Sequence, residues 1–279
     1  MIYIIIPVFN RKHFTKDCLL SLREQTNKNF KIVVVDDGST DGTSDMLRAD
    51  FSEVDILFGD GNLFWTAATN LGIKYALEKD ASHILTLNND VIALPDYIEK
   101  MIYWSEKYPN ALLGSLALEK GTDKPTYGGE IINWANHTYK YLLDQLPQEE
   151  QKGLHKVTHF PGRGLLIPSQ VFNKIGLYAE KALPHYMADH DFTHKALRNN
   201  FEIYCNFDAK LYTYPEASGD HQNRKKKSLQ KYYNHLFDIR GGGNIRNFIV
   251  YTFRNCPPLF IPSFLSIGLA KRVFGYFLK

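Results

Sequence analysis

Four short polar segments hold the side chains of this sequence that are best suited to binding and acid–base chemistry. Three follow apolar runs and one opens a helix-like segment, at residues 7–10, 36–37, 88–90 and 189–191. The oxygens of Asp and Asn are ligands that hard divalent cations prefer, and a carboxylate can also accept a proton as a general base. The residue types therefore predict a site that holds a metal ion and removes a proton from a substrate.

Short apolar runs alternate with helix-like segments through the first half of the chain, and these elements must position the polar segments. The alternation is typical of βαβ units and predicts an α/β fold with a mixed, mainly parallel sheet flanked by helices. We expect strands at residues 3–6, 32–35, 55–58, 83–87 and 112–118. Ligands of such sheets bind beyond the carboxyl ends of the strands, so the polar segments are expected to meet at that edge.

The alternation is lost between residues 119 and 158, which are rich in Tyr, Gln, Glu and Lys and which we interpret as an insertion. Order returns with a glycine-bracketed strand at residues 160–168, a helix at 189–199 and a pair of strands at 202–214. Basic and aromatic residues dominate the rest of the chain. We therefore expect an α/β domain at residues 1–215 and a helical, aromatic C-terminal extension at 216–279.

The composition is that of an ordinary globular protein, with 279 residues of which 44% are hydrophobic and 23% are charged. Its three cysteines are widely separated and include no CxxC pair, which argues against a disulfide framework and favours a reducing, cytoplasmic compartment. The apolar residues 1–7 have no basic region before them, so we interpret them as a buried strand and not as a signal peptide. A net charge of +3 is too small to indicate nucleic-acid binding.

Six sequence blocks occur in a characteristic order, at residues 4–11, 33–43, 70–73, 87–91, 160–168 and 188–192. Together they resemble glycosyltransferase family 2 over residues 1–215. The resemblance implies a GT-A fold, a UDP- or dTDP-linked sugar donor, Mg²⁺ or Mn²⁺, and transfer with inversion at the anomeric carbon. Residues 61–66 and 88–90 are also similar to rhamnosyltransferase-like members of the family.

The resemblance implies roles for four side chains. Phe9 would stack on the nucleobase, and Asp37 would hydrogen-bond the edge of that base. Asp90 would bind the metal, and Asp189 would act as the general base. These roles fit together chemically, because an inverting transfer needs one carboxylate to take the acceptor proton while a metal neutralises the leaving diphosphate.

Further positions are expected to complete the donor and metal sites. The donor-binding residues would also include Pro7, Asn10, Asp36, Asn70, Asn88, Asn89, Arg163 and Gly164. The glycines around Arg163 would let the backbone approach the donor sugar while Arg163 contacts a phosphate, unless they are a plain bend in a strand. His221 is a second candidate metal ligand, and the alternative is a surface-loop histidine.

Three positions depart from the family pattern. Asn88 replaces the first carboxylate of the Asp-x-Asp metal signature, so we expect Asp90 to be the sole carboxylate and metal binding to be weak and coupled to the donor. Thr69 stands where the family often has Arg, and Ala188 stands where Glu usually precedes the base.

Two carboxylates and one histidine have second interpretations. Asp36 is equally suited to holding its loop, and Asp191 is a rival general base. Residues 189–194 also have the spacing of a metal cluster, in which His194 is alternatively a partly buried helix residue.

The expected activity is that of a hexosyl- or deoxyhexosyl-transferase (EC 2.4) in cell-surface polysaccharide synthesis. Its acceptor would be a glycan or a lipid-linked glycan, bound beside residues 119–158. One alternative is a nucleotide-sugar-binding module without turnover. The other is a sugar-phosphate nucleotidyltransferase, which usually has a glycine-rich loop after the first strand that residues 7–11 lack.

Basic residues toward the C-terminus predict peripheral contact with the cytoplasmic face of a membrane. A basic run at residues 224–227 is joined by Lys231, Arg254, Lys271 and Arg272, beside an apolar tail at 259–265. This combination suits an anionic lipid surface, although Pro262 makes the tail a poor membrane span. The aromatic tail is equally suited to pairing with a second copy as a homodimer.

Overall fold

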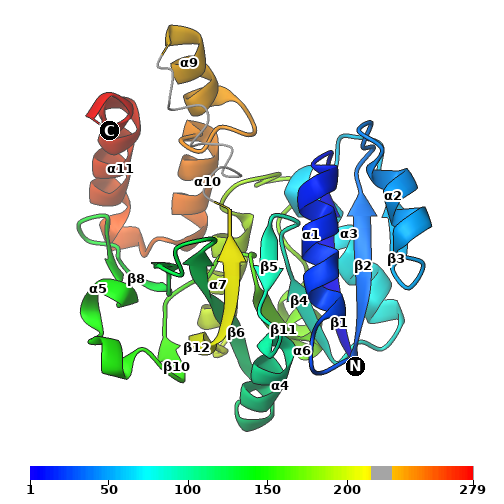
Figure 1. Ribbon diagram of the computed structural model, residues 1–279. Helices are drawn as coiled ribbons and strands as arrows, with labels where there is room; N and C mark the ends of the chain where they lie inside the picture. The colour runs from blue at the N-terminus through cyan, green and yellow to red at the C-terminus, as the bar shows by residue number, and fades with distance from the viewer. Residues whose placement is uncertain (215–227, 279) are drawn as a thin grey trace.

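A computed structural model describes residues 1–214 and 228–278 of the chain (Figure 1). The strands of this part are β1 Ile2–Val8, β2 Phe30–Asp36, β3 Asp55–Phe58, β4 His83–Thr86, β5 Val91–Ala93, β6 Ala111–Glu119, β7 Pro125–Tyr127, β8 Glu130–Asn133, β9 Thr138–Tyr141, β10 Leu154–Lys156, β11 Leu165–Pro168 and β12 Glu202–Thr213. The helices are α1 Lys12–Arg23, α2 Thr43–Asp50, α3 Phe64–Glu78, α4 Tyr97–Lys107, α5 Leu142–Gln145, α6 Ser169–Ile175, α7 Ala188–Arg198, α9 Leu229–Phe237, α10 Ile245–Asn255 and α11 Ile261–Leu278. Two short 3₁₀ turns lie at Gln148–Glu150 and Pro258–Phe260.

The described residues contain one large sheet in the order β10-β12-β6-β11-β4-β1-β2-β3, with β5 and β7 added to β12 and β6. Strands β3, β2, β1 and β4 are parallel, and the expected α/β class with a mixed, mainly parallel sheet is confirmed. Strand β11 runs antiparallel between β4 and β6 and so joins the two halves of the sheet. The carboxyl ends of β1, β2 and β4 consequently lie at the same edge.

Two hydrophobic layers hold the helices against the sheet. Ile4 and Ile6 face α1, α2 and α4, whereas Ile5 faces α3, α6 and α7. All three isoleucines are fully buried, as the continuous apolar run 2–6 predicts for a strand covered on both faces. Gly72 lets α3 approach β1 closely, since a Cβ there would lie 2.4 Å from Ile5 Cγ2.

The expected pair of strands at residues 202–214 is instead the single strand β12, which contains a bulge between Asn206 and Lys210. The polar residues that are typical of turns lie inside this bulge. Asn206 Oδ1 accepts from the backbone N–H of Asp208 at 3.1 Å, and the Asp208 carboxylate accepts from Trp104 Nε1 at 2.9 Å. Polar residues that suggested a chain reversal therefore only bend the strand.

The segment 119–158 folds without βα units, as its irregular sequence predicts. It contributes β7 and β10 to the main sheet and forms a separate hairpin of β8 and β9. Ile132 of this hairpin shares a core with Phe248, Tyr251, Cys256 and Phe264 of the C-terminal helices. The hairpin and the C-terminal helices are therefore packed as one layer.

Figure 1 shows α10 and α11 side by side above the hairpin, with α9 at the far end of α10. Several of the basic residues predicted to face a membrane contact the protein itself. Lys271 Nζ donates to the His137 carbonyl at 2.6 Å, and the Arg272 guanidinium lies 3.6 Å from the centre of the Phe248 ring. Among the helices of residues 1–214 and 228–278, none combines the length and the hydropathy needed to cross a membrane.

Candidate active site

The loops that follow β1 and β2 are joined by hydrogen bonds. Asn10 and Arg11 both have left-handed backbone angles, with φ of 59° and 65°. This turn lets Asn10 N donate to Ser39 Oγ at 2.7 Å and lets Asn10 Oδ1 accept from Thr40 N at 2.9 Å. Phe9 is left 39% exposed at the edge of the sheet. Pro7, in contrast, lies within β1 opposite Val35.

The two carboxylates after β2 are buried and bonded to the backbone. Asp36 accepts from Ser39 N at 2.9 Å and from the Ser44 hydroxyl, so it holds the loop as its alternative interpretation predicts. Asp37 accepts from the N–H groups of Gly61, Leu63 and Phe64 at 2.8, 3.0 and 3.2 Å. Asp37 thereby orders the loop after β3 and brings Phe64 close to Phe9.

An arginine of the C-terminal extension lies on these two aromatic rings. The Arg240 guanidinium carbon is 5.0 Å from the centre of the Phe9 ring and 5.5 Å from that of Phe64. Burial and, secondarily, the charge of Arg240 lower the pKa of His185 to about 4. Sequence reasoning missed Arg240, although the adjacent triple glycine at 241–243 indicated a turn that could bring the extension back to the sheet.

Asp90 lies in a charged group at the end of β4. Its Oδ2 is 2.8 Å from Arg11 Nη1, and its side chain is 17% exposed. Burial lowers the pKa of Arg163, and the negative charge of Asp90 is the largest of the effects that oppose this shift. Asn88 Oδ1 accepts from Trp65 Nε1 at 3.1 Å, so this amide faces the same region. His221, the other predicted metal ligand, lies outside the described residues.

Three predicted donor-binding residues are packed in the protein interior and are not part of the charged group at Asp90. Asn89 is buried and donates to Thr15 Oγ1 at 3.0 Å. Asn70 is buried and exchanges hydrogen bonds with the backbone of Tyr178, at 3.0 and 3.1 Å. A Cβ on Gly164 would lie 2.6 to 3.0 Å from Leu211, Ser115 and Tyr97 side chains, so this glycine serves close packing in the core.

Asp189 lies in the first turn of α7, partly exposed, and faces the glycine-bracketed segment. Its Oδ2 accepts from Gly162 N at 2.9 Å and its Oδ1 from His190 N at 2.9 Å. A Cβ on Gly162 would lie 2.3 Å from the Trp65 ring, so only glycine lets this backbone pass between Trp65 and Asp189. The two backbone N–H bonds hold both oxygens of the carboxylate in place.

Asp191 is 2% exposed and anchors the C-terminal extension. It accepts from Arg254 Nε and Nη2 at 2.7 and 2.9 Å and from Asn255 Nδ2 at 2.8 Å. These contacts occupy the carboxylate, so the structure gives Asp191 an anchoring role in place of the alternative role as a base. The salt bridge joins α7 to α10, and its two residues are 63 positions apart in the sequence.

The anchoring role predicts a loss of stability when the charge of Asp191 is removed. Asp191→Asn cannot keep the bidentate ion pair, but Arg254 is 39% exposed and regains water. We therefore expect the free energy of unfolding to fall by about 1–3 kcal/mol, less than for a fully buried pair. Urea unfolding of both variants measures this loss, with Asp45→Asn as the control because Asp45 is 88% exposed in the first turn of α2. Equal stability of the two variants would contradict the anchor.

Sequence comparison assigns the class of protein. The profile of glycosyl transferase family 2 matches residues 3–175, so the chain belongs to this family. An uncharacterized glycosyltransferase of Rickettsia typhi is 31% identical over 206 residues, which are 71% of this chain and 59% of the relative. A second, from Rickettsia prowazekii, is 32% identical over the same shares. The chain thus spans 59% of the length of these relatives.

Solved structures confirm the GT-A fold. A crystal structure of GalNAc-T7 with UDP, GalNAc and Mn²⁺ superposes with a TM-score of 0.62 at 13% identity, over 84% of this chain and 48% of that one. A crystal structure of Staphylococcus aureus TarS, residues 1–349, superposes with a TM-score of 0.58 at 16% identity, over 99% of this chain and 88% of that one.

Proposed function

We propose that this protein is an inverting glycosyltransferase that moves a sugar from a nucleotide diphosphate donor to a hydroxyl group of a glycan or lipid-linked acceptor. One observation carries the proposal. The exposed ring of Phe9, the charged group at Asp90 and the partly exposed Asp189 lie along one edge of a GT-A sheet. Family membership and the names of the Rickettsia relatives support the reaction class.

The proposed base-binding surface consists of Phe9 and Phe64. In the described structure Arg240 lies over both rings, and a nucleobase stacks on the same faces. Binding of the donor is then expected to displace Arg240 or to place it beside the diphosphate. Asp37 contributes by fixing the loop that leads to Phe64.

The proposed diphosphate site lies between Arg11, Arg163 and Asp90. Mg²⁺ and Mn²⁺ sites commonly use one or two protein carboxylates together with substrate phosphates, so a single Asp90 fits the donor set. Arg11 occupies one of its oxygens and leaves the other for a cation. When bound, the metal would neutralise the leaving diphosphate, a task that the arginine cations share.

Asp189 is the proposed general base. Its oxygens accept only backbone N–H bonds from Gly162 and His190 among the described hydrogen bonds, which keeps the carboxylate oriented. A carboxylate so placed removes the acceptor proton as the new glycosidic bond forms and the bond to the diphosphate breaks. The acceptor would approach over the hairpin of β8 and β9, which is on the same side as α7.

A donor panel tests the class of reaction. UDP- and dTDP-linked hexoses and deoxyhexoses, including rhamnose, are added with and without Mn²⁺ while thermal unfolding is followed. We expect one donor to raise the melting temperature, more strongly with Mn²⁺, and that donor to support transfer. Binding without hydrolysis or transfer would instead favour a nucleotide-sugar-binding module. No response to any donor would contradict the proposal.

The stacking role of Phe9 makes a separate prediction. Phe9→Ala is expected to weaken binding of the donor about 5- to 100-fold, because one aromatic–base stack contributes about 1–3 kcal/mol. The measurement is isothermal titration with the donor found in the panel. Phe58→Ala is the matched control, since Phe58 is also an exposed ring at a strand end with an arginine, Arg48, 5.1 Å from its centre. Equal affinity of both variants would exclude Phe9 from the base site.

A further inference from the structure

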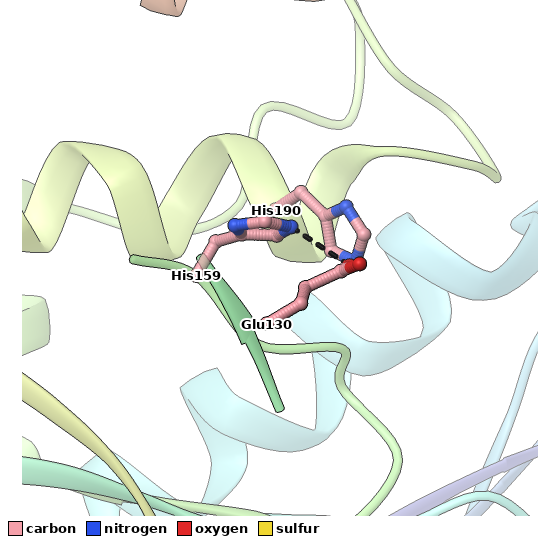
Figure 2. Close-up of side chains that lie close together, drawn as sticks. All are labelled: Glu130, His159 and His190. Carbon is pink, nitrogen blue, oxygen red and sulfur yellow. Dashed lines mark hydrogen bonds and ion pairs between the residues drawn. The ribbon is translucent and has the colours of Figure 1, made fainter. Parts of the chain in front are cut away.

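A second cluster of metal-ligating side chains lies beside Asp189 and has no part in the donor site. It consists of Glu130 at the start of β8, His159 before β11 and His190 in the first turn of α7 (Figure 2). One ligand atom from each side chain lies within 4.8 Å of the others. His159 is fully buried and the Glu130 side chain is 9% exposed. The three segments are far apart in sequence, and the fold brings them together.

The Thr158 hydroxyl lies beside His159 and can orient its ring. It is 3.3 Å from the Glu130 carbonyl, accepts from Ile132 N at 2.9 Å, and lies 2.9 Å from His159 Nδ1. When Nδ1–H donates to this hydroxyl, the neutral imidazole carries a lone pair at Nε2, which is the form that binds a metal ion.

The Nε2 atom faces the Glu130 carboxylate. His159 Nε2 is 3.0 Å from Glu130 Oε1, and Figure 2 shows the two groups directed at each other with the His190 ring beside them. Without a metal ion, this contact is a hydrogen bond from Nε2–H to the carboxylate. A cation that displaces this hydrogen would be held by the same two atoms, with the hydrogen moved to Nδ1 beside the Thr158 hydroxyl.

We propose that Glu130, His159 and His190 bind a divalent transition metal, with Zn²⁺ as the preferred ion, at a site separate from Asp90. Two imidazole nitrogens and one carboxylate oxygen form a ligand set typical of zinc, whereas Mg²⁺ prefers oxygen ligands alone. Zinc bonds of about 2.0–2.1 Å place tetrahedral ligand atoms about 3.3 Å apart, close to the Glu130–His159 distance. Three protein ligands leave a fourth position to water.

The site would join the hairpin to the helix that carries the proposed base. Glu130 belongs to β8, and His190 directly follows Asp189, so a bound ion fixes the start of α7 relative to the hairpin. His194, one turn further on, stacks on His159 with ring centres 4.8 Å apart and fixes the ring from its other face. The Thr158 hydroxyl completes the arrangement by orienting the ligand nitrogen.

Glu130→Gln is the decisive variant. Its amide can donate to or accept from His159 Nε2 at the same position, so the fold is kept while the anionic ligand is lost. Full-length protein without an affinity tag is dialysed against a chelator and titrated with ZnCl₂ by calorimetry, and with Co²⁺ by visible absorption. We expect one ion per chain in the wild type, with the visible absorption bands of four-coordinate Co²⁺. We expect no such binding in Glu130→Gln.

Two further variants separate this site from others. Thr158→Val is expected to weaken Zn²⁺ binding about 10- to 100-fold, because Nδ1–H of a metal-bound His159 loses its hydrogen-bond acceptor. Asp90→Asn and His155→Gln are expected to bind Zn²⁺ as the wild type does, since His155 is bonded to the carbonyls of Glu150 and Lys152. Zn²⁺ binding that survives Glu130→Gln, or that is lost in Asp90→Asn, would overturn the proposal. A wild type that binds no Zn²⁺ would overturn it as well, and the Glu130–His159 contact would then be a hydrogen bond alone.

Discussion

Asp189→Asn is expected to reduce the rate of sugar transfer about 10²- to 10⁴-fold, the usual contribution of a general base. The amide still accepts one of the two backbone hydrogen bonds, from Gly162 or from His190, so the start of α7 is kept. Donor affinity is expected to stay unchanged, because Asp189 contacts neither the Phe9 ring nor Arg11. The loss should therefore appear in kcat and not in the KM for the donor.

Transfer is measured with the donor that the thermal-shift panel identifies, and affinity by titration. Asp191→Asn serves as a matched control two residues away. It alters the anchor of the C-terminal helices and is expected to cost stability, with a smaller effect on kcat at a temperature where the variant is folded. A near-normal kcat for Asp189→Asn, or an equal loss in both variants, would exclude Asp189 as the base.

Asp90→Asn is expected to remove the metal dependence of donor binding. A neutral amide oxygen is a weak ligand for Mg²⁺ or Mn²⁺, and Asp90 is the sole carboxylate of residues 88–90. Since metal stabilisation of a leaving group is worth several kcal/mol, we expect transfer to fall by about 10²- to 10³-fold.

The measurement is titration of the donor with and without Mn²⁺, followed by kinetics. In the wild type Mn²⁺ should tighten binding of the donor, and in Asp90→Asn it should not. Asp60→Asn is the control, because Asp60 is an exposed carboxylate in the adjacent loop that bonds only Asn62 N among the described contacts. If Mn²⁺ tightens donor binding equally in Asp90→Asn and in the wild type, the metal is held elsewhere.

The parallel half of the fold could be predicted because the hydrophobic pattern specifies it directly. Strands β1 to β4 lie where continuous apolar runs, separated by helix-like segments, predict them. The strand β11 could not be placed in the same way. Its position between β4 and β6 depends on long-range pairing, and the apolar run that forms it would fit any buried strand.

Sequence position identified which loops form the site but not which way their side chains point. Phe9 and Asp90 face the edge of the sheet, whereas the neighbouring Asn89 turns inward to Thr15. That direction depends on backbone angles such as the left-handed pair at Asn10 and Arg11. Consecutive residues after a strand alternate in direction, so a polar block of three is expected to be divided between surface and interior.

Residues from distant segments were the hardest to predict. Arg240 reaches Phe9 and Glu130 reaches His159 only because the C-terminal helices and the hairpin fold back on the sheet. Neither residue lies in a recognisable motif. The sequence did not indicate the salt bridge between Asp191 and Arg254 either. An acidic residue next to a predicted base cannot be distinguished, in sequence, from a second base.

The common core of the hairpin and the C-terminal helices constrains how this protein can be re-engineered. Ile132 packs with Phe248, Tyr251 and Phe264, so an exchange of the hairpin alone would place foreign side chains against an unaltered partner layer. A chimera that borrows the acceptor side of a relative should carry residues 119–158 and the C-terminal helices as a single cassette. The sheet from β1 to β4, with its own two layers of core, can then remain as the recipient scaffold.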